Sequence, residues 1–389
     1  MPDVLMIIFW LMLALLVYVY GGFSVLVVLV AHARKRSVKQ EDITPSLSLI
    51  IPVWNEEKAI AARLDNALAL DYPADRLEII VPSDGSTDRT EEMVRSYADR
   101  GVHLLALPRR GKIYGLKDAV NVATGELLVF SDANSMYERD ALRKLARNFA
   151  DPQVGGVCGN QVYLKNKKAD TASQGENLYW SFDKWLKQKE SLTGSIVSAH
   201  GAIYAIRRSL YQPPASAAVT DDFAISTAVI EQGYRLVFES EAIAYEEPMP
   251  AAAREFSRKV RIMNRGLCGV LLRRRLLNPL RYGFYAVILF SHKVLRRLVP
   301  IFLLMLLAAS WLLQSRHDFF LFAAVAQTLF YAMAGCGYLL RRRRLGRLKF
   351  FYIPFFYCLA NAAALLAIIK LLRGNRIEFW QPQRQGTAG

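Results

Sequence analysis

Cysteine is scarce in this sequence, and its spacing gives it no obvious structural role. The 389 residues contain four cysteines, namely Cys158, Cys268, Cys336 and Cys358. They show neither the short spacing of a metal-binding pair nor the clustering of a disulfide framework. We therefore expect free thiols in a reducing compartment. Cys336 and Cys358 lie within apolar runs, where packing is the simplest role for them.

Acidic residues are also few relative to basic ones. Asp and Glu number 34 against 50 Lys and Arg, so the formal net charge is +16 at pH 7. Such an excess can indicate nucleic-acid binding, but here much of it flanks apolar runs. The flanking clusters are Arg34–Arg36, Arg273–Arg275, Arg296-Arg297 and Arg341–Arg344. Cations in these positions are typical of the cytoplasmic ends of membrane helices. We therefore expect a membrane protein that does not bind nucleic acid.

Charge is absent from a long N-terminal run, Leu5–Val30, which exceeds the roughly 20 residues needed to cross a bilayer. No basic residue precedes the run and no small-residue cleavage site follows it. We therefore expect a retained transmembrane helix over residues 1–31 rather than a signal peptide. The basic residues after it predict that its C-terminal end is cytoplasmic.

Three more apolar runs predict a C-terminal transmembrane region over residues 298–373. They are Leu298–Leu313, Phe319–Leu340 and Phe350–Leu372. A full crossing by the last run would place the basic tail at 374–389 outside the cell, against the usual charge rule. A re-entrant or interfacial last run would remove that conflict, and both alternatives stay open. Residues 251–297 mix apolar and basic side chains, which suits amphipathic helices at a membrane surface or helices packed on a soluble domain.

Between these regions, residues 45–250 read as a soluble α/β domain. The expected strands are Leu47–Val53, Leu77–Val81, Val102–Leu107 and one starting at Leu127, followed later by Val154–Leu164 and Ala202–Ile206. The expected helices are Ala59–Leu70, Thr87–Ala98, Ile113–Ala123, Glu138–Phe149 and Tyr179–Lys189. The alternation of strands and helices in the first half predicts a parallel sheet with right-handed crossovers.

Polar side chains follow several of these strands. The run Leu127–Phe130 leads to Asp132 and Asn134, whose oxygens suit a divalent cation that carries substrate phosphates; a helix cap is the simpler alternative. Ligands of open α/β sheets bind at the carboxyl ends of the strands. The other polar residues expected near this edge are Pro52, Asn55 and Glu56 after the first strand, Asp84 after the second, Lys112 before the third helix, and Asp221 with Asp222 further along.

This order of motifs resembles the family-2 glycosyltransferases with a GT-A fold, in particular the membrane-embedded branch that includes cellulose, chitin and hyaluronan synthases. The resemblance covers about Ser46 to Arg265. It implies an α/β, Rossmann-like GT-A domain with flanking transmembrane and interfacial helices. By the same resemblance, the Pro52–Glu57 turn and Asp84 would hold the nucleoside of a nucleotide-sugar. Lys112 would lie near its phosphates.

The resemblance also implies that Asp132 engages the donor and an Mg²⁺ or Mn²⁺ ion, and that Asp222 is the general base. Glycosyl transfer needs a neutralised leaving diphosphate and a carboxylate that takes the acceptor's proton. One base without a second catalytic carboxylate implies a single inverting displacement. In an extended segment Asp221 and Asp222 would point in opposite directions, so that one faces the acceptor and the other braces the loop.

Three positions depart from the family pattern. Asn134 replaces the second Asp of the metal motif, and Ser83 replaces the Asp that usually precedes Asp84. Arg258-Lys-Val-Arg261-Ile262 only approximates the Gln-x-x-Arg-Trp motif and lacks its Trp, which argues against processive synthesis. Arg258 and Arg261 suit either substrate phosphates or lipid headgroups. His200 lies where relatives line the acceptor pocket, although a lone His is more often structural.

The sequence thus predicts a multi-pass protein of the inner (plasma) membrane with a cytoplasmic glycosyltransferase domain. The donor is expected to be a UDP-sugar, and the acceptor a growing polysaccharide or a lipid-linked glycan. Two alternatives are a processive synthase that exports its polymer and a noncatalytic membrane scaffold that binds a nucleotide-sugar.

Overall fold

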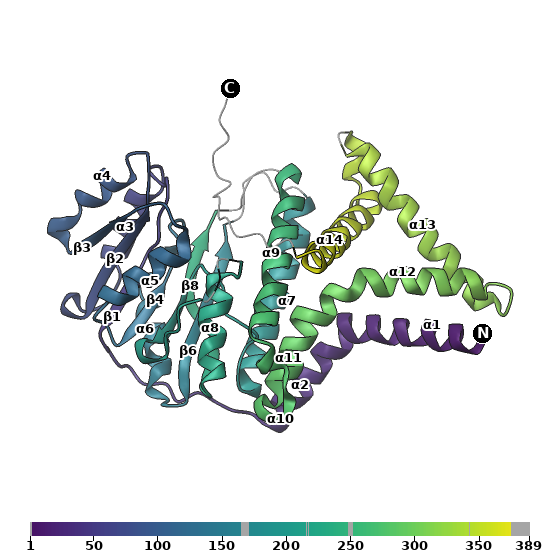
Figure 1. The fold of residues 1–389 in the computed structure, drawn as a ribbon, viewed down its shortest axis with the longest axis horizontal. Helices are drawn as coiled ribbons and strands as arrows, with labels where there is room; N and C mark the ends of the chain where they lie inside the picture. The colour runs from purple at the N-terminus through teal and green to yellow at the C-terminus, as the bar shows by residue number, and fades with distance from the viewer. Residues whose placement is uncertain are drawn as a thin grey trace.

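The structure is a computed structural model, and it describes residues 2–164, 171–214, 216, 218–247, 252–341 and 343–374. The predicted basic tail at 374–389 therefore lies, except for Gly374, outside the described residues. Figure 1 shows a sheet-containing region at one end of the molecule and long helices at the other. Helices α7 (Thr171–Thr193) and α9 (Ala252–Leu272) lie between these two parts.

The described residues form one eight-stranded sheet in the order β3-β2-β1-β4-β7-β6-β8-β5. Its first four strands are parallel: β1 (Leu47–Ile50), β2 (Leu77–Asp84), β3 (Val102–Leu107) and β4 (Leu127–Phe130). The predicted parallel arrangement is confirmed for these four. The second half is mixed, and consists of β5 (Met136–Tyr137), β6 (Val154–Tyr163), β7 (Tyr204–Arg207) and β8 (Arg235–Glu246).

Both faces of the parallel half are covered by helices, because successive apolar residues of its strands point to opposite faces of the sheet. Leu47 and Leu49 of β1 pack with Ile60 and Leu64 of α3 (Ile60–Leu68). Ile50 packs on the opposite face with residues of α5 (Lys112–Val122). Strands buried on both faces read as continuous apolar runs. This explains why the strands were recognisable in the sequence.

Helix boundaries differ from the expected ones where side chains take over backbone hydrogen bonds. Helix α4 (Thr90–Arg95) begins three residues after the predicted Thr87, because Asp88 Oδ1 accepts a hydrogen bond from Thr90 N at 3.0 Å. The predicted helix over Glu138–Phe149 is α6 (Ala141–Ala146) followed by a 3₁₀ turn, Arg147–Ala150. Helix α7 is longer than its prediction at both ends.

Four helices in the described residues are long and apolar enough to cross a membrane. The first joins α1 (Pro2–Val17) to α2 (Phe23–Ala33) through a π-helical turn, η1 (Tyr18–Gly22). The second joins α11 (Phe284–Leu289) to α12 (Arg296–Leu313) through another π-helical turn, η7 (Phe290–Leu295). The others are α13 (Asp318–Leu340) and α14 (Lys349–Leu372).

The second apolar helix runs across a boundary that the sequence suggested. The run Tyr282–Phe290 was assigned to the interface helices and the next span was expected to begin at Leu298. The structure instead has one continuous helix over Phe284–Leu313. The polar residues that separated the two runs in the sequence, including His292 and Lys293, are accommodated within the π-helical turn η7.

The two π-helical turns lie against each other. Tyr18 of η1 and Ser291 of η7 share a hydrogen bond of 2.9 Å between their hydroxyls. The rings of Phe23 and His292 meet edge to face at 5.1 Å. Towards the N-terminus, Phe9 and Leu16 of α1 pack with Val299 and other apolar residues of α12. Figure 1 shows α1 and α12 running side by side.

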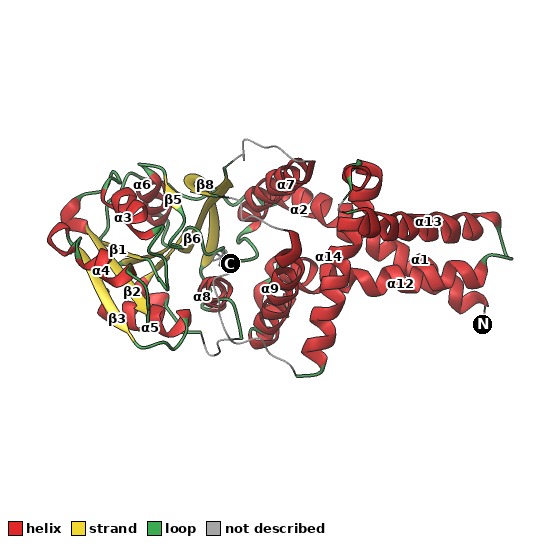
Figure 2. Cartoon of the chain, turned by 90° about the horizontal axis from the view of Figure 1, so that it is seen from above, coloured by secondary structure: helices red, strands yellow, loops and turns green. Residues whose placement is uncertain are grey.

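Helix α14 takes a different direction from its neighbours. Figure 2 shows it running across α12 and α13, with α9 beside it. Ala363 and Ala367 of α14 pack on Val260 of α9, and Asn264 Nδ2 donates to the carbonyl of Ala367 at 3.2 Å. On the other side of α9, a side chain at Gly269 would clash with Phe223 of α8 (Asp221–Glu231). Helix α9 therefore joins the sheet-containing part to α14.

Candidate functional site

The turns after β1 and β2 are tied together by side-chain hydrogen bonds. Asn55 adopts a left-handed conformation with φ of 51°, which Asn tolerates better than most residues. Its Oδ1 accepts from Thr87 N at 2.8 Å, and its own N donates to Ser86 Oγ at 3.1 Å. Glu56 N donates to Thr90 Oγ1 at 2.8 Å. The residues predicted to contact a nucleoside thus lie at one edge of the sheet, with the buried Pro52 beneath them.

Asp84 at the end of β2 is buried, and its carboxylate holds the loop that leads into α5. It forms an ion pair with Arg109 and accepts from the backbone N–H groups of Arg110 at 2.7 Å and Gly111 at 2.8 Å. The Arg109 guanidinium stacks over the ring of Trp54, 3.7 Å from its centroid. The geometry assigns Asp84 this loop-holding role, and its contact with a nucleoside stays a prediction.

Lys112 lies at the centre of the site. Its Nζ is 2.8 Å from Asp132 Oδ1 and 3.0 Å from Asp221 Oδ2. Burial acts to lower the pKa of Lys112, but the two carboxylates outweigh burial and raise that pKa above its ordinary value. The structure thus brings together three residues predicted from separate parts of the sequence.

The turn that carries Asp132 is supported from below by a buried arginine. Arg63 of α3 is fully buried and donates through Nη2 to Ser131 Oγ at 3.1 Å. Its guanidinium also lies over the ring of Tyr137, 4.5 Å from the centroid. On the other side, a Cβ at Gly201 would lie 3.0 Å from Asp132 Oδ2. Asp132 therefore has close neighbours in the Arg63-supported turn and at Gly201, while 38% of its side chain stays exposed.

Asp221 and Asp222 are the first two residues of α8, which corrects the expectation of an extended segment. Thr220 before them has an extended backbone and is the N-cap residue. Threonine is favoured at this position and acidic residues are favoured in the first helical turn. The two side chains consequently leave the helix in different directions without pointing to opposite sides of a strand.

The two carboxyl groups have opposite pKa shifts. Burial acts to raise the pKa of Asp221, but the charges of Lys112 and Arg265 outweigh it and lower that pKa. Burial and the negative charge of Asp221 raise the pKa of Asp222. A pair of carboxyl groups whose environments separate their pKa values is suited to two different roles. Asp222 is the one better suited to accept a proton.

The donor atoms for a metal ion are few. The described residues contain no group of three or more His, Cys, Asp or Glu side chains arranged to hold one. Asp132 and Asn134 lie in the same turn after β4 and together offer one carboxylate and one amide oxygen. Mg²⁺ is commonly bound by one or two carboxylates together with waters and substrate phosphates. The residues present therefore fit an ion that arrives with a diphosphate.

Helix α9 adds a basic stripe. Arg258, Arg261 and Arg265 share one helix face because they are spaced by three and four residues. Arg265 Nη2 donates to the carbonyl of Val219 at 2.7 Å, just before α8. Burial, together with the positive charges of Arg265 and Arg258, lowers the pKa of Arg261. The predicted residues Arg258 and Arg261 thus lie on the same helix face as Arg265, whose charge lowers the pKa of Asp221.

His200 lies next to Gly201 and therefore close to Asp132. Its Nδ1 is buried and has no hydrogen-bond partner in the described part of the chain. Burial and the nearby charge of Lys187 lower the pKa of His200 to about 3. The imidazole is thus neutral at physiological pH, which suits it to a polar contact rather than to holding a positive charge.

Comparison of the sequence with known protein families shows which family the domain that carries these residues belongs to. Residues 48–213 match the model of Glycosyl transferase family 2. This part of the chain is a family-2 glycosyltransferase domain. The match covers β1 to β4 and extends past β7, and thus includes Asp84, Lys112 and Asp132.

Curated relatives support the same family. The chain is 26% identical over 210 residues to a poly-beta-1,6-N-acetyl-D-glucosamine synthase of Staphylococcus aureus (strain COL), which covers 52% of this chain and 50% of that protein. It is also 26% identical over 213 residues to the probable glycosyltransferase YdaM of Bacillus subtilis (strain 168), covering 52% and 51%. The chain thus spans about half the length of the curated relatives it matches.

A solved structure confirms the fold. The mannosyltransferase PcManGT from Pyrobaculum calidifontis, solved in complex with GDP-Man and Mn²⁺, superposes with a TM-score of 0.68 and 22% identity. The match covers 94% of this chain and 99% of that one. The predicted resemblance and the GT-A fold class are therefore confirmed.

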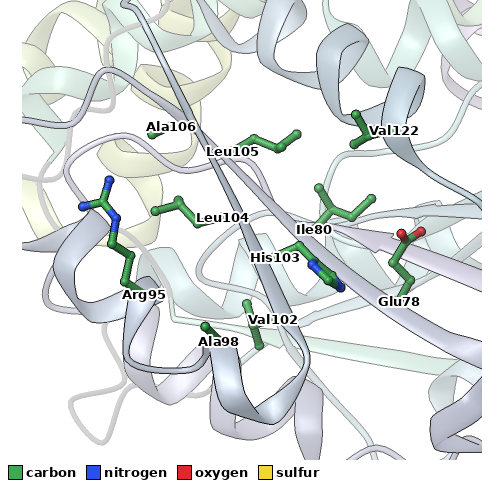
Figure 3. Close-up of a pocket in the computed structure, with 10 residues that line it drawn as sticks. All are labelled: Glu78, Ile80, Arg95, Ala98, Val102, His103, Leu104, Leu105, Ala106 and Val122. Carbon is green, nitrogen blue, oxygen red and sulfur yellow. The ribbon is translucent and has the colours of Figure 1, made fainter.

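A hollow at the edge of the sheet lies apart from the candidate site. A depression of about 530 Å³ lies along β3, the edge strand of the sheet, and Figure 3 shows its lining. Its lining includes His103 and Glu78, whose carboxylate accepts from Ser48 Oγ at 2.6 Å and Thr124 N at 3.0 Å. None of the predicted site residues lines it.

Sequence reasoning missed several charged residues around the site. Arg63 was detectable, because an arginine three residues after Ile60 falls on the apolar face of α3. Arg109 was harder to identify, because it lies in a loop among other basic residues. The ion pair between Asp183 and Lys187, 2.9 Å apart on α7, follows the common i,i+4 spacing and gave no sign of its burial. Lys293 resembled an ordinary membrane-flanking cation.

Proposed function

We propose that the chain is an inverting glycosyltransferase that moves a sugar from a nucleoside-diphosphate donor to a polysaccharide or lipid-linked acceptor. The observation that carries this proposal is the meeting of Lys112 with Asp132 and Asp221 at the carboxyl edge of the sheet, beside Asp222. The family-2 domain supports the reaction class.

The donor side would be formed by Lys112, Asp132 and Asn134. The Lys112 ammonium provides positive charge where a leaving diphosphate would develop negative charge. Asp132 and Asn134 would hold a divalent ion, which would supply further neutralisation of that diphosphate. Arg261 and Arg265 on α9 add positive charge near the start of α8. The Mn²⁺ in the PcManGT complex is consistent with this arrangement.

Asp222 would act as the base. The acceptor hydroxyl oxygen forms a bond to the anomeric carbon as the bond from that carbon to the diphosphate oxygen breaks. The hydroxyl proton moves to Asp222, whose pKa is raised by burial and by Asp221. A base whose pKa approaches the working pH transfers protons most efficiently. One displacement on the face opposite the leaving group inverts the anomeric configuration.

We also propose that the catalytic domain, residues 45–250, is cytoplasmic and that the four apolar helices are membrane-embedded. Residues 1–31 and 298–373 would form the membrane region, with 251–297 at the interface except for the part of the helix that begins at Phe284. The basic residues after α2 and at the start of α12 favour this orientation.

A single-addition enzyme is the favoured form of this function, because Ile262 occupies the place of the Trp in the synthase motif. The similarity to a poly-beta-1,6-N-acetyl-D-glucosamine synthase favours the alternative of a processive enzyme. Size analysis of a radiolabelled product separates the two, since a processive enzyme makes long chains before short ones accumulate.

Nucleotide release by the purified full chain tests the proposal. The donor panel should include UDP-sugars, which we expect to be used, and GDP-mannose, with Mg²⁺ or Mn²⁺ and a membrane lipid extract as the source of acceptor. Release that depends on the extract and is lost in Asp222→Asn supports the function. Donor binding without release from any member of the panel would instead support the scaffold alternative.

A further inference from the structure

The start of α8 separates two charged environments. On one side Asp221 contacts Lys112 at 3.0 Å, in the proposed donor site. On the other side Asp222 lies within electrostatic range of Lys293, and Lys293 is also within range of Lys187 and Asp183 of α7. Lys187 belongs to α7, and Lys293 belongs to the π-helical turn η7. The proposed base thus faces a second cluster of charges.

Most members of this second cluster are paired. Lys187 forms an ion pair with Asp183 at 2.9 Å, and both side chains are less than one-fifth exposed. Glu190 is fully buried, lies 2.7 Å from His292 Nε2 and accepts from Val197 N at 3.1 Å. Asp183 and Glu190 of α7 are therefore already occupied by partners other than Lys293.

Lys293 differs from these residues. Its ammonium lies over the ring of Phe223, 5.5 Å from the centroid. Within the part of the chain that the structure describes, no carboxylate lies within ion-pair distance of it. Its side chain is only partly exposed. An enclosed cation without an anionic partner is unfavourable, and a ring face compensates only part of the lost hydration.

A second cation is held next to Lys293. Arg297, one turn further along, donates through Nη1 to the carbonyl of Lys293 at 2.8 Å. Its Nη2 lies so close to α9 that a Cβ at Gly266 would be 2.9 Å away. Lys293 and Arg297 thus lie close together where η7 and the start of α12 approach α8 and α9, at the point where an apolar helix meets the glycosyltransferase domain.

We propose that Lys293 binds a phosphate carried by a lipid acceptor, next to the hydroxyl from which Asp222 takes the proton. This inference rests on the proposed function and narrows its acceptor to a phosphate-bearing lipid. A lysine ammonium is a compact charge that suits phosphate. The lipid origin follows from the position of Lys293 within Phe284–Leu313, a helix long and apolar enough to cross a membrane. The phosphate itself takes no part in bond making.

Binding of two short-chain lipids to the full chain in neutral detergent tests the proposal. Dihexanoyl phosphatidylglycerol carries a phosphate beside hydroxyls, and dihexanoylglycerol carries a hydroxyl without the phosphate. We expect Lys293→Met to weaken binding of the phosphatidylglycerol about tenfold or more, as for the loss of a charged hydrogen-bond partner, and to leave binding of dihexanoylglycerol unchanged. Lys293→Arg should retain most of the affinity. Arg296→Met, an exposed cation on the same helix, is the matched control and should bind like wild type.

Three results would overturn the proposal. The first is equal phosphatidylglycerol affinity for Lys293→Met and wild type, and the second is an equal loss in Arg296→Met. The third is binding of inorganic phosphate as tight as that of the phosphatidylglycerol with the same dependence on Lys293, which would assign the site to free phosphate. If Lys293→Met does not fold, Lys293→Gln replaces it, and Lys293→Arg must then bind more tightly than Lys293→Gln. Nucleotide release from the wild type is measured separately, so that failure of glycosyl transfer is distinguished from failure of lipid binding.

Discussion

Asp221 and Asp222 are adjacent in sequence, yet burial and neighbouring charges shift the pKa values of their carboxyl groups in opposite directions. Lys112 reaches Asp221 at 3.0 Å. At Asp222, one residue on, burial and the negative charge of Asp221 outweigh the hydrogen bond from Phe223 N and the charge of Lys112, so that its pKa is raised. The start of α8 therefore gives the two carboxylates different electrostatic roles, which the following predictions test.

Replacement of the proposed base should stop transfer without preventing donor binding. Asp222→Asn is expected to lower kcat at least about 100-fold, because general-base catalysis is lost. Affinity for the nucleotide-sugar should change little, since the proposed donor-binding residues Lys112, Asp132 and Asn134 are all retained. Nucleotide release and equilibrium donor binding are measured on the same preparation. Normal turnover in Asp222→Asn together with an inactive Asp221→Asn would move the base by one residue.

The pH dependence of the reaction should report the Asp222 carboxyl. Asp222 accepts a proton only when ionised, so kcat/KM should fall as the pH drops through its raised pKa. Asp221→Asn removes a neighbouring negative charge and one partner of Lys112, and both changes favour ionised Asp222. The acidic limb of the profile should therefore move to lower pH in Asp221→Asn. An acidic limb that moves to higher pH would contradict the proposed coupling.

Donor and metal binding should depend more on Asp132 than on Asn134. Asp132→Ala removes the anionic ligand and a partner of Lys112, whereas Asn134→Ala removes a neutral oxygen. UDP affinity is titrated at increasing Mn²⁺ for the wild type and both variants. We expect Mn²⁺ to strengthen binding in the wild type and in Asn134→Ala but hardly in Asp132→Ala. Metal-independent UDP affinity in the wild type would exclude the metal role.

Gly201 should be needed for the position of Asp132. A methyl group at this residue would lie 3.0 Å from Asp132 Oδ2, so the carboxylate must move by a few tenths of an ångström. Gly201→Ala is expected to lower kcat/KM roughly tenfold, since small misplacements of reacting groups are costly. Gly335→Ala in α13, where a Cβ meets nothing within 4 Å, is the control and should be nearly normal. Similar losses in both variants would show a general effect of the substitution.

Membrane orientation decides whether the domain can reach a cytoplasmic donor. A cysteine introduced by Asp99→Cys should be shielded from an impermeant thiol reagent in intact cells, whereas one introduced by His317→Cys, between α12 and α13, should be labelled. Both are made in a background without Cys336 and Cys358, because these two thiols are not buried. Labelling at position 99 in unbroken cells would reverse the orientation and remove the proposed donor access.

The parallel half of the fold could be predicted because its information is local. Leu127–Phe130 is apolar throughout, and Leu47–Ile50 is apolar except for Ser48, as expected for strands buried on both faces. The position of Asp132 followed from the end of Leu127–Phe130, and that of Asp84 from the end of β2. The mixed half depends on pairing between distant segments, such as β4 with β7 and β6 with β8. No local pattern specifies such pairing.

Site residues were predictable where their chemistry is unusual for their position. Lys112, Asp132 and Asp221 follow or precede recognisable elements, and the structure brings them into contact. The environment of Lys293 was not predictable, because it depends on a π-helical turn and on packing against Phe223. The helical start of Asp221-Asp222 was missed because the pair was placed in an extended segment, although threonine at position 220 suits an N-cap.

The hydrogen bond between Tyr18 and Ser291 has a mechanical consequence. It joins two apolar helices at their π-helical turns, and it is partly buried. Sliding one helix along the other would break this bond and separate the rings of Phe23 and His292. These two contacts therefore fix the position of one helix along the axis of the other. His292 also contacts Glu190 of α7, so α7 is linked to the same pair of helices. A shift of the first helix along its axis would therefore be transmitted to the charged residues of α7 near Asp222.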